Sequence, residues 1–223
     1  MRRPVQLDDL KDVNPTYSRG GMKFSRHELR DIVISMAFLI ASFTIIYIRG
    51  IDTRYSNYWE IVLFYLGLST LFVVTAFLCH EMAHKYVAQK YGAWSEFRMF
   101  LPGLLFCLIF SFTGFLFAAP GAVMISGRID KEEYGRISLA GPAVNFFIAG
   151  LAILFVLVSG INGLVASILM MMAYLNAFLG IFNMIPIPPL DGSKVIRWSV
   201  PAYLLTVFIG IAEVAFVYWT LWL

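Results

Sequence analysis

Long apolar runs separated by short polar segments dominate the chain. After a polar lead at residues 1–31, apolar runs occupy residues 32–48, 59–79, 139–158, 164–185 and 200–223. An α-helix rises about 1.5 Å per residue, so even the shortest run spans roughly 25 Å as a helix. Runs of this length are typical of transmembrane helices. The pattern therefore predicts an all-α polytopic membrane protein with about five transmembrane helices.

One further apolar stretch, Phe100–Ser126, does not fit this pattern. Prolines and glycines interrupt it at Pro102-Gly103, Gly114 and Pro120-Gly121. Non-helical backbone is tolerated at membrane depth only where it lies against protein or a wet cavity. We expect this stretch to form a re-entrant segment or short hairpin beside such a cavity. This stretch can also form a small membrane-associated β-sheet.

Basic residues indicate how the spans are oriented, because cytoplasmic segments carry an excess of lysine and arginine. The lead is the most basic segment, with Arg2, Arg3, Lys11, Arg19, Lys23, Arg26 and Arg30. If Phe100–Ser126 enters and leaves on one side, Lys194 and Arg197 lie on the same side as this lead. If it crossed once, they would lie outside. The first arrangement obeys the rule and predicts a multi-pass cell-membrane protein with a cytoplasmic N-terminus.

Composition supports lipid as the solvent for much of this chain. Apolar residues make up 60% of it and charged residues 14%, against about 25% charged in soluble domains. The net charge of +3 gives no reason to expect a nucleic-acid partner. We expect two parts, a polar cytoplasmic lead at residues 1–31 and a membrane-embedded domain at residues 32–223.

One segment places ionisable residues where lipid disfavours them. His80-Glu81-Met82-Ala83-His84 directly follows the apolar run 59–79. Residues four apart on a helix lie on one face, so His80 and His84 can bind the same ion. Glu81, between them, can orient or deprotonate a water at that ion. This spacing is the zinc-peptidase signature, with two histidine ligands and a glutamate general base.

The same five residues could match that signature by accident, or form a helix end at the lipid headgroups. The membrane context decides between these readings. Each ionisable residue near the bilayer centre costs about 2.5–3.5 kcal/mol on insertion scales. Three such residues in five positions indicate a bound metal that offsets this cost, so we favour a zinc site.

A catalytic zinc ion needs a third protein ligand. Asp191 is the best candidate, because it lies in the proline-rich segment 186–192, whose broken backbone can approach the metal. His84 and Asp191 both reach the cytoplasmic side if Phe100–Ser126 forms a hairpin. Asp191 could instead cap a short helix that begins at Gly192.

Together these motifs resemble the site-2 protease family of intramembrane zinc metalloproteases. The resemblance rests on three segments, His80–His84, Leu139–Asn145 and Phe182–Gly192, and covers roughly residues 61–199. It implies that the protein hydrolyses peptide bonds within or near the transmembrane segments of single-span membrane proteins. On the topology favoured above, the active site would open toward the cytoplasm.

The resemblance assigns roles to particular residues. It implies one zinc ion per chain on His80, His84 and Asp191, with Glu81 as the general base. Asn183 matches a polar residue near the family's site, where it would position substrate or the developing oxyanion. Its alternative role is an interhelical hydrogen bond.

The chain also departs from the family pattern. Many relatives carry a PDZ or CBS domain, and no segment between the spans here is long enough for either. Glu213, a lone carboxylate in the last run, has two readings. It serves gating or substrate contact, as intramembrane carboxylates often do, or it is protonated and hydrogen-bonded to a neighbouring span.

Two other functions stand as alternatives to proteolysis. A non-proteolytic scaffold would keep the fold and the metal, but it would not need Glu81. A metal transporter often has internal repeats with broken helices in matching positions. This sequence has no such repeat.

Overall fold

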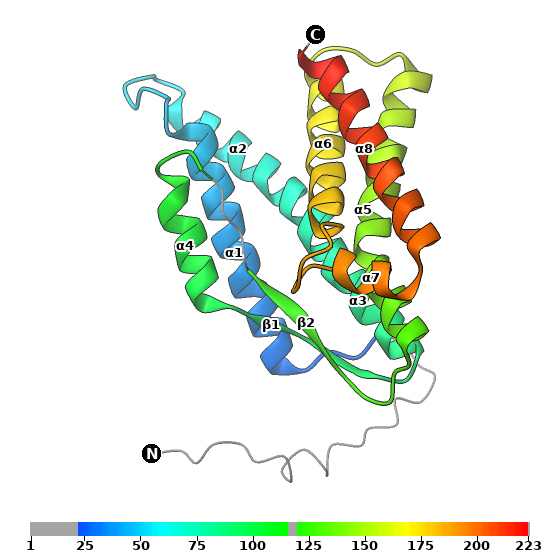
Figure 1. Cartoon of the computed structure of the whole chain (residues 1–223). Helices are drawn as coiled ribbons and strands as arrows, with labels where there is room; N and C mark the ends of the chain where they lie inside the picture. The colour runs from blue at the N-terminus through cyan, green and yellow to red at the C-terminus, as the bar shows by residue number, and fades with distance from the viewer. Residues whose placement is uncertain (1–21, 116–119, 223) are drawn as a thin grey trace, which may run out of the picture.

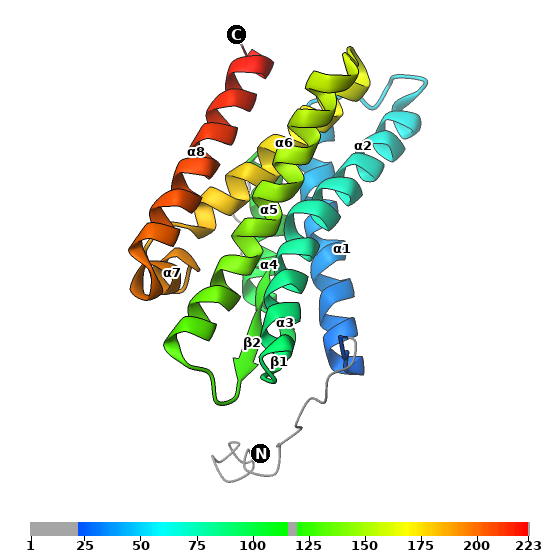
Figure 2. The same cartoon turned by 90° about the vertical axis from the view of Figure 1, so that its right-hand side faces the viewer.

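The computed structural model describes residues 22–115 and 120–222. Within these residues, five helices are long and apolar enough to cross a membrane: Arg26–Ile48, Tyr58–Lys90, Lys131–Ser159, Leu164–Asn183 and Val200–Thr220. This confirms the predicted all-α architecture with about five spans. Figure 2 shows α1 and α8 on opposite sides of the molecule, with α5 and α6 between them.

The first span, α1 (Arg26–Ile48), begins after the N-cap residue Ser25. The Ser25 hydroxyl accepts a hydrogen bond from the Glu28 amide at 3.1 Å. The Glu28 carboxylate does not return to Ser25. It lies fully buried against Lys85, with a shortest N–O distance of 2.8 Å. A buried carboxylate is stabilised more by a cation than by one backbone amide, so the tertiary contact overrides the local one.

The second span is one continuous helical path in three parts. These are α2 (Tyr58–Phe72), the π-helical segment η2 (Val73–Leu78) and α3 (Cys79–Lys90). A π-helical turn changes the hydrogen-bond register, and such turns often lie at functional sites. Here it ends two residues before His80, and within it the Ala76 carbonyl oxygen accepts a hydrogen bond from Asn145 Nδ2 at 2.9 Å.

The broken apolar stretch forms the expected hairpin. The hairpin also takes in the residues just before this stretch, and it consists of β1 (Trp94–Met99), α4 (Leu101–Ser111) and β2 (Gly121–Ser126). The strands pair antiparallel, and the Phe100 amide donates to the Pro120 carbonyl oxygen at 2.9 Å, so the chain leaves beside the point where it entered. Figure 1 shows α4 beside α1. The hairpin and the small β-sheet are thus confirmed.

The remaining helices form the second half of the molecule. They are α5 (Lys131–Ser159), α6 (Leu164–Asn183), α7 (Gly192–Trp198) and α8 (Val200–Trp222). α5 begins before the predicted apolar run, because Asp130 and Glu133 form a capping box that makes the charged connector helical. Small buried residues lie where these helices pack together: Ala149 and Ala152 on α5, and Ala173 and Ala177 on α6. Small side chains let membrane helices approach closely.

Candidate metal centre

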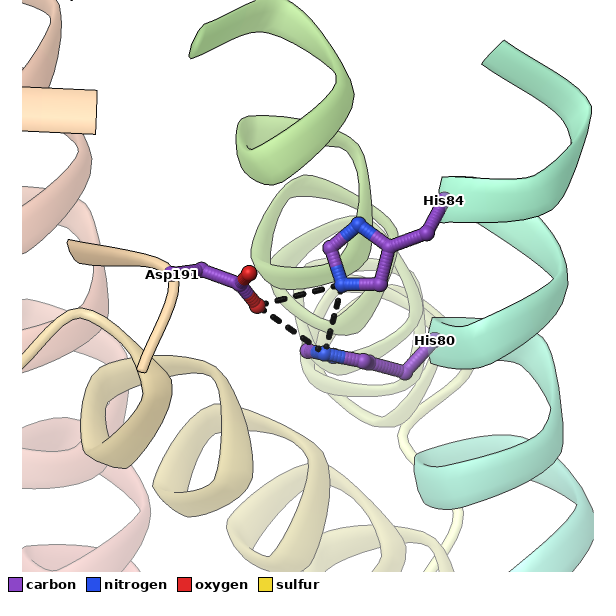
Figure 3. Close-up of side chains that lie close together, drawn as sticks. All are labelled: His80, His84 and Asp191. Carbon is purple, nitrogen blue, oxygen red and sulfur yellow. Dashed lines mark hydrogen bonds and ion pairs between the residues drawn. The ribbon is translucent and has the colours of Figure 1, made fainter. Parts of the chain in front are cut away.

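Three predicted ligands come together between α3 and the loop before α7. His80 and His84 lie one turn apart on α3, with their Nε2 atoms 3.1 Å apart. Asp191 Oδ2 lies 3.4 Å from His80 Nε2 and 3.1 Å from His84 Nε2. All three side chains are buried and could hold a metal ion. Figure 3 shows the carboxylate facing the two imidazoles from the opposite side.

The spacing of these atoms fits zinc. Zinc binds nitrogen and carboxylate oxygen at roughly 2.0–2.2 Å, which places two ligand atoms of a tetrahedral site about 3.4 Å apart. The three distances here lie between 3.1 and 3.4 Å. Two histidines and one carboxylate leave a fourth position for water or substrate, as in catalytic rather than structural zinc sites.

Each ligand is held by a second contact. His84 Nδ1 lies 2.7 Å from the Ile137 carbonyl oxygen, which can only accept, so Nδ1 carries the proton. His80 Nδ1 contacts Asn145 Oδ1 at 2.5 Å. Lys194 Nζ donates to Asp191 Oδ1 at 3.2 Å, leaving Oδ2 toward the histidines. Such partners fix the ring orientation and turn both Nε2 atoms into the site.

Helix α5 forms the back of this centre. Ile137, Gly141 and Asn145 are four residues apart and so lie on one face of α5. A Cβ atom on Gly141 would overlap the Nε2 atoms of both His80 and His84. The sequence assigned neither Gly141 nor Asn145 a role at the metal. Their four-residue spacing was the available signal, but nothing in the sequence shows which helix they face.

Asp191 lies where the predicted third ligand would be, and its side chain does not cap α7. It occupies the N-cap position of α7, but its side chain makes no capping hydrogen bond. Burial alone would raise the pKa of the Asp191 carboxyl, but the adjacent His84 and His80 side chains outweigh it and hold that pKa well below its usual value. The carboxylate is therefore in the charged form that binds metal.

Glu81 is buried beside the ligands, on the side of the small sheet. Its Oε2 atom accepts a hydrogen bond from the Val123 amide of β2 at 3.1 Å. A carboxylate one residue after a ligand can reach a water at the metal, so its role as general base stays a prediction with suitable geometry.

Two other candidate residues have different surroundings from those expected. Asn183 Nδ2 donates to the Leu179 carbonyl oxygen of its own helix at 3.0 Å, and no interhelical hydrogen bond of Asn183, its alternative role, is seen among the described residues. Its role toward substrate stays a prediction. Glu213 Oε2 is buried without a hydrogen-bond partner among the described residues, so the bond expected to a neighbouring span is not seen at this oxygen.

The fold and site define a multi-pass membrane protein with a His₂Asp metal centre, and comparisons assign its family. The model of "Peptidase family M50" matches residues 160–204, which include Asp191. "Putative zinc metalloprotease MJ0611" of Methanocaldococcus jannaschii is 37% identical over 79% of this chain and 87% of its own. The chain belongs to peptidase family M50, the site-2 protease family.

More distant relatives share part of their length with this chain. "Zinc metalloprotease MJ0392" of Methanocaldococcus jannaschii is 33% identical over 64% of this chain and 35% of its own. "Putative zinc metalloprotease Rip3" of Mycobacterium tuberculosis is 29% identical over 63% of this chain and 33% of its own. The chain thus spans about a third of these two relatives. No solved structure matches it.

Proposed function

We propose that this protein is an intramembrane zinc metalloendopeptidase that hydrolyses peptide bonds within or near transmembrane segments of membrane proteins. The observation that carries the proposal is the convergence of His80, His84 and Asp191, with Glu81 beside them, among helices apolar enough to cross a membrane. The family and the names of its relatives support metal-dependent peptide hydrolysis. The membrane setting supports substrates that are themselves membrane segments.

The residues at the site can carry out each proton transfer. Bound zinc would supply Lewis-acid chemistry, polarising a carbonyl and lowering the pKa of water to about 7. Glu81 takes one proton as the water oxygen bonds to the peptide carbonyl carbon. The carbon–nitrogen bond then breaks, and Glu81 returns the proton to the leaving nitrogen. The products are a carboxylic acid and an amine, and Glu81 is again ionised.

A transmembrane substrate must unwind before it can react, because its peptide carbonyls are bonded within its own helix. An unwound segment can pair with an exposed strand edge. The sequence left room for a small β-sheet around the broken stretch Phe100–Ser126. The structure has β1 and β2 there, and the Glu81–Val123 bond puts β2 beside the metal centre. This placement supports delivery of an extended segment to the site.

The proposed orientation puts the N-terminus and the mouth of the site on the cytoplasmic side. α5 contacts the metal centre around Gly141, about 15 Å along the helix from Lys131 at about 1.5 Å per residue. The centre is therefore nearer to the basic end of α5, where Arg128 and Arg136 also lie, than to the uncharged turn after Ser159. Basic segments favour the cytoplasm.

The decisive experiment compares the wild type with Glu81→Ala in detergent. We expect about one zinc ion per chain in both proteins. Only the wild type should cleave a single-span fusion protein, because the variant lacks the base. Zinc in both without cleavage by either would favour a non-proteolytic scaffold. Absence of zinc, or equal cleavage by both proteins, would refute the proposal.

A further inference from the structure

The two edges of the small sheet differ in how their backbone groups are occupied. On the outer edge of β1, the Phe97 amide donates to Glu28 Oε1 at 3.0 Å and the Met99 amide donates to Asp31 Oδ2 at 3.4 Å. The Ser95 carbonyl oxygen accepts from Lys85 Nζ at 2.9 Å. Side chains of α1 and α3 thus fill this edge, so β1 is closed to strand addition.

The other edge, on β2, has a different environment. Phe97 lies opposite Val123, and Phe97 directs its amide away from β2. Opposed residues of an antiparallel pair share this direction, so Gly121, Val123 and Ile125 direct their amides away from β1. Among the described residues, Val123 is the one of these three whose amide has a partner, and that partner is Glu81 Oε2 at 3.1 Å.

We propose that the Val123 amide sets the register of the substrate strand and so selects the bond that is cut. In the free protein, Glu81 occupies the position that a substrate carbonyl oxygen would take on this amide. A strand that pairs with β2 displaces Glu81 from Val123 and leaves its carboxylate free for water. The inference rests on the proposed peptidase function and goes beyond it, because it names what fixes the cleavage position.

The physical argument is the proximity of one donor to the reacting group. The substrate residue bonded to Val123 lies within one hydrogen bond of the place that Glu81 now occupies, next to His80 and His84. Outward-facing amides recur every second residue of a strand, about 6.8 Å apart. Pairing through the Ile125 amide instead would move the substrate by two residues, so a neighbouring bond would reach the site.

The test compares Val123→Pro with Ile125→Pro in the full-length, zinc-loaded protein. Proline removes one amide and is tolerated on a strand edge whose amide points away from the ladder. Both variants exchange a β-branched residue of β2 for proline, so they are matched in chemistry and in strain. The probe is the single-span fusion protein above, and mass spectrometry of its fragments gives the position of the cut.

We expect Val123→Pro to retain zinc. It should either cut two residues away or cut the original bond with kcat/KM lowered roughly tenfold, which is the effect of losing one hydrogen bond at the upper end of its usual free-energy range. Ile125→Pro should keep the original cut with a raised KM. Wild-type position and rate in Val123→Pro would overturn the proposal, and so would an equal shift in both variants. A wild type that cuts nothing would instead count against the peptidase function.

Amide exchange gives a second measurement if Val123→Pro does not fold. In Glu81→Ala the Val123 amide loses its partner, so we expect it to exchange faster with solvent. Adding the uncleaved fusion protein should slow that exchange again. No effect of the fusion protein on Val123 would overturn the proposal, because a bound strand has to cover this amide.

Discussion

Gly141 contributes to the metal centre by having no side chain. It faces the two histidine ligands from α5, and a methyl group there would overlap both Nε2 atoms. Asn145, one turn further along, is fully buried and bonds His80, Ala76 and Asn176. A buried amide with all these partners fixes the position of the ligand it touches. The geometry of the centre thus depends on residues other than its three candidate ligands.

We expect Gly141→Ala to weaken zinc binding by more than about 100-fold, beyond the usual effect of altering a ligand's partner. Zinc content after dialysis against graded chelator concentrations measures this. Gly150→Ala is the matched control, because it lies on the same helix and its added methyl meets only the end of the Glu213 side chain, at 3.1 Å. Wild-type zinc affinity in Gly141→Ala would contradict the geometry described here.

At the scale of elements, a buried ion pair joins the first span to the metal-binding helix. Lys85 and Glu28 are both fully buried, and Lys85 follows the ligand His84 directly. Lys85 also contacts the Ser95 carbonyl oxygen, and Glu28 accepts from the Phe97 amide. One pair of charges therefore ties α1, α3 and β1 together. This connection indicates that α1 anchors the sheet at the site.

Removing one partner of this pair should be costly. Lys85→Met leaves Glu28 as a buried, uncompensated charge, which typically costs about 3–5 kcal/mol of stability. The double variant Lys85→Met with Glu28→Gln removes the charge and keeps an oxygen for the Phe97 amide, so we expect it to be more stable than Lys85→Met alone. Thermal unfolding in detergent compares the three proteins. Equal melting temperatures of Lys85→Met and the wild type would show that the ion pair does not stabilise the fold by this amount.

At the scale of the whole molecule, the two ends of α5 differ in charge. α5 runs from the charged Lys131 end, near the metal centre, to Ser159, and an uncharged turn follows. The two ends of this helix are about 43 Å apart at 1.5 Å per residue, more than the thickness of a bilayer core. They should therefore lie on opposite sides of the membrane.

Single cysteines at these two ends test the orientation in intact cells. Asn162→Cys, in the uncharged turn, should react with a membrane-impermeant maleimide added outside. Lys131→Cys should react only after the cells are permeabilised, since basic segments favour the cytoplasm and the proposed orientation puts this end there. The unsubstituted protein, with Cys79 and Cys107, gives the background. The reverse labelling pattern would place the mouth of the site outside the cell.

The sequence by itself determined the features that depend on local periodicity. The apolar runs gave the number of spans, and prolines and glycines marked the hairpin between Phe100 and Ser126. The four-residue spacing of His80 and His84 predicted a shared ligand position, because a helix repeats every 3.6 residues. Asp191 could be chosen as the third ligand because the chain near it is broken by prolines.

Only the tertiary structure decided which distant surfaces meet. It showed Glu28 bonded to Lys85 and not to Ser25, and it brought the Gly141 and Asn145 face of α5 against the histidines. It also placed the Val123 amide on Glu81. Periodicity fixes the face on which a residue lies, but packing between helices far apart in the chain fixes what that face contacts, and a single sequence does not encode that pairing in any local pattern.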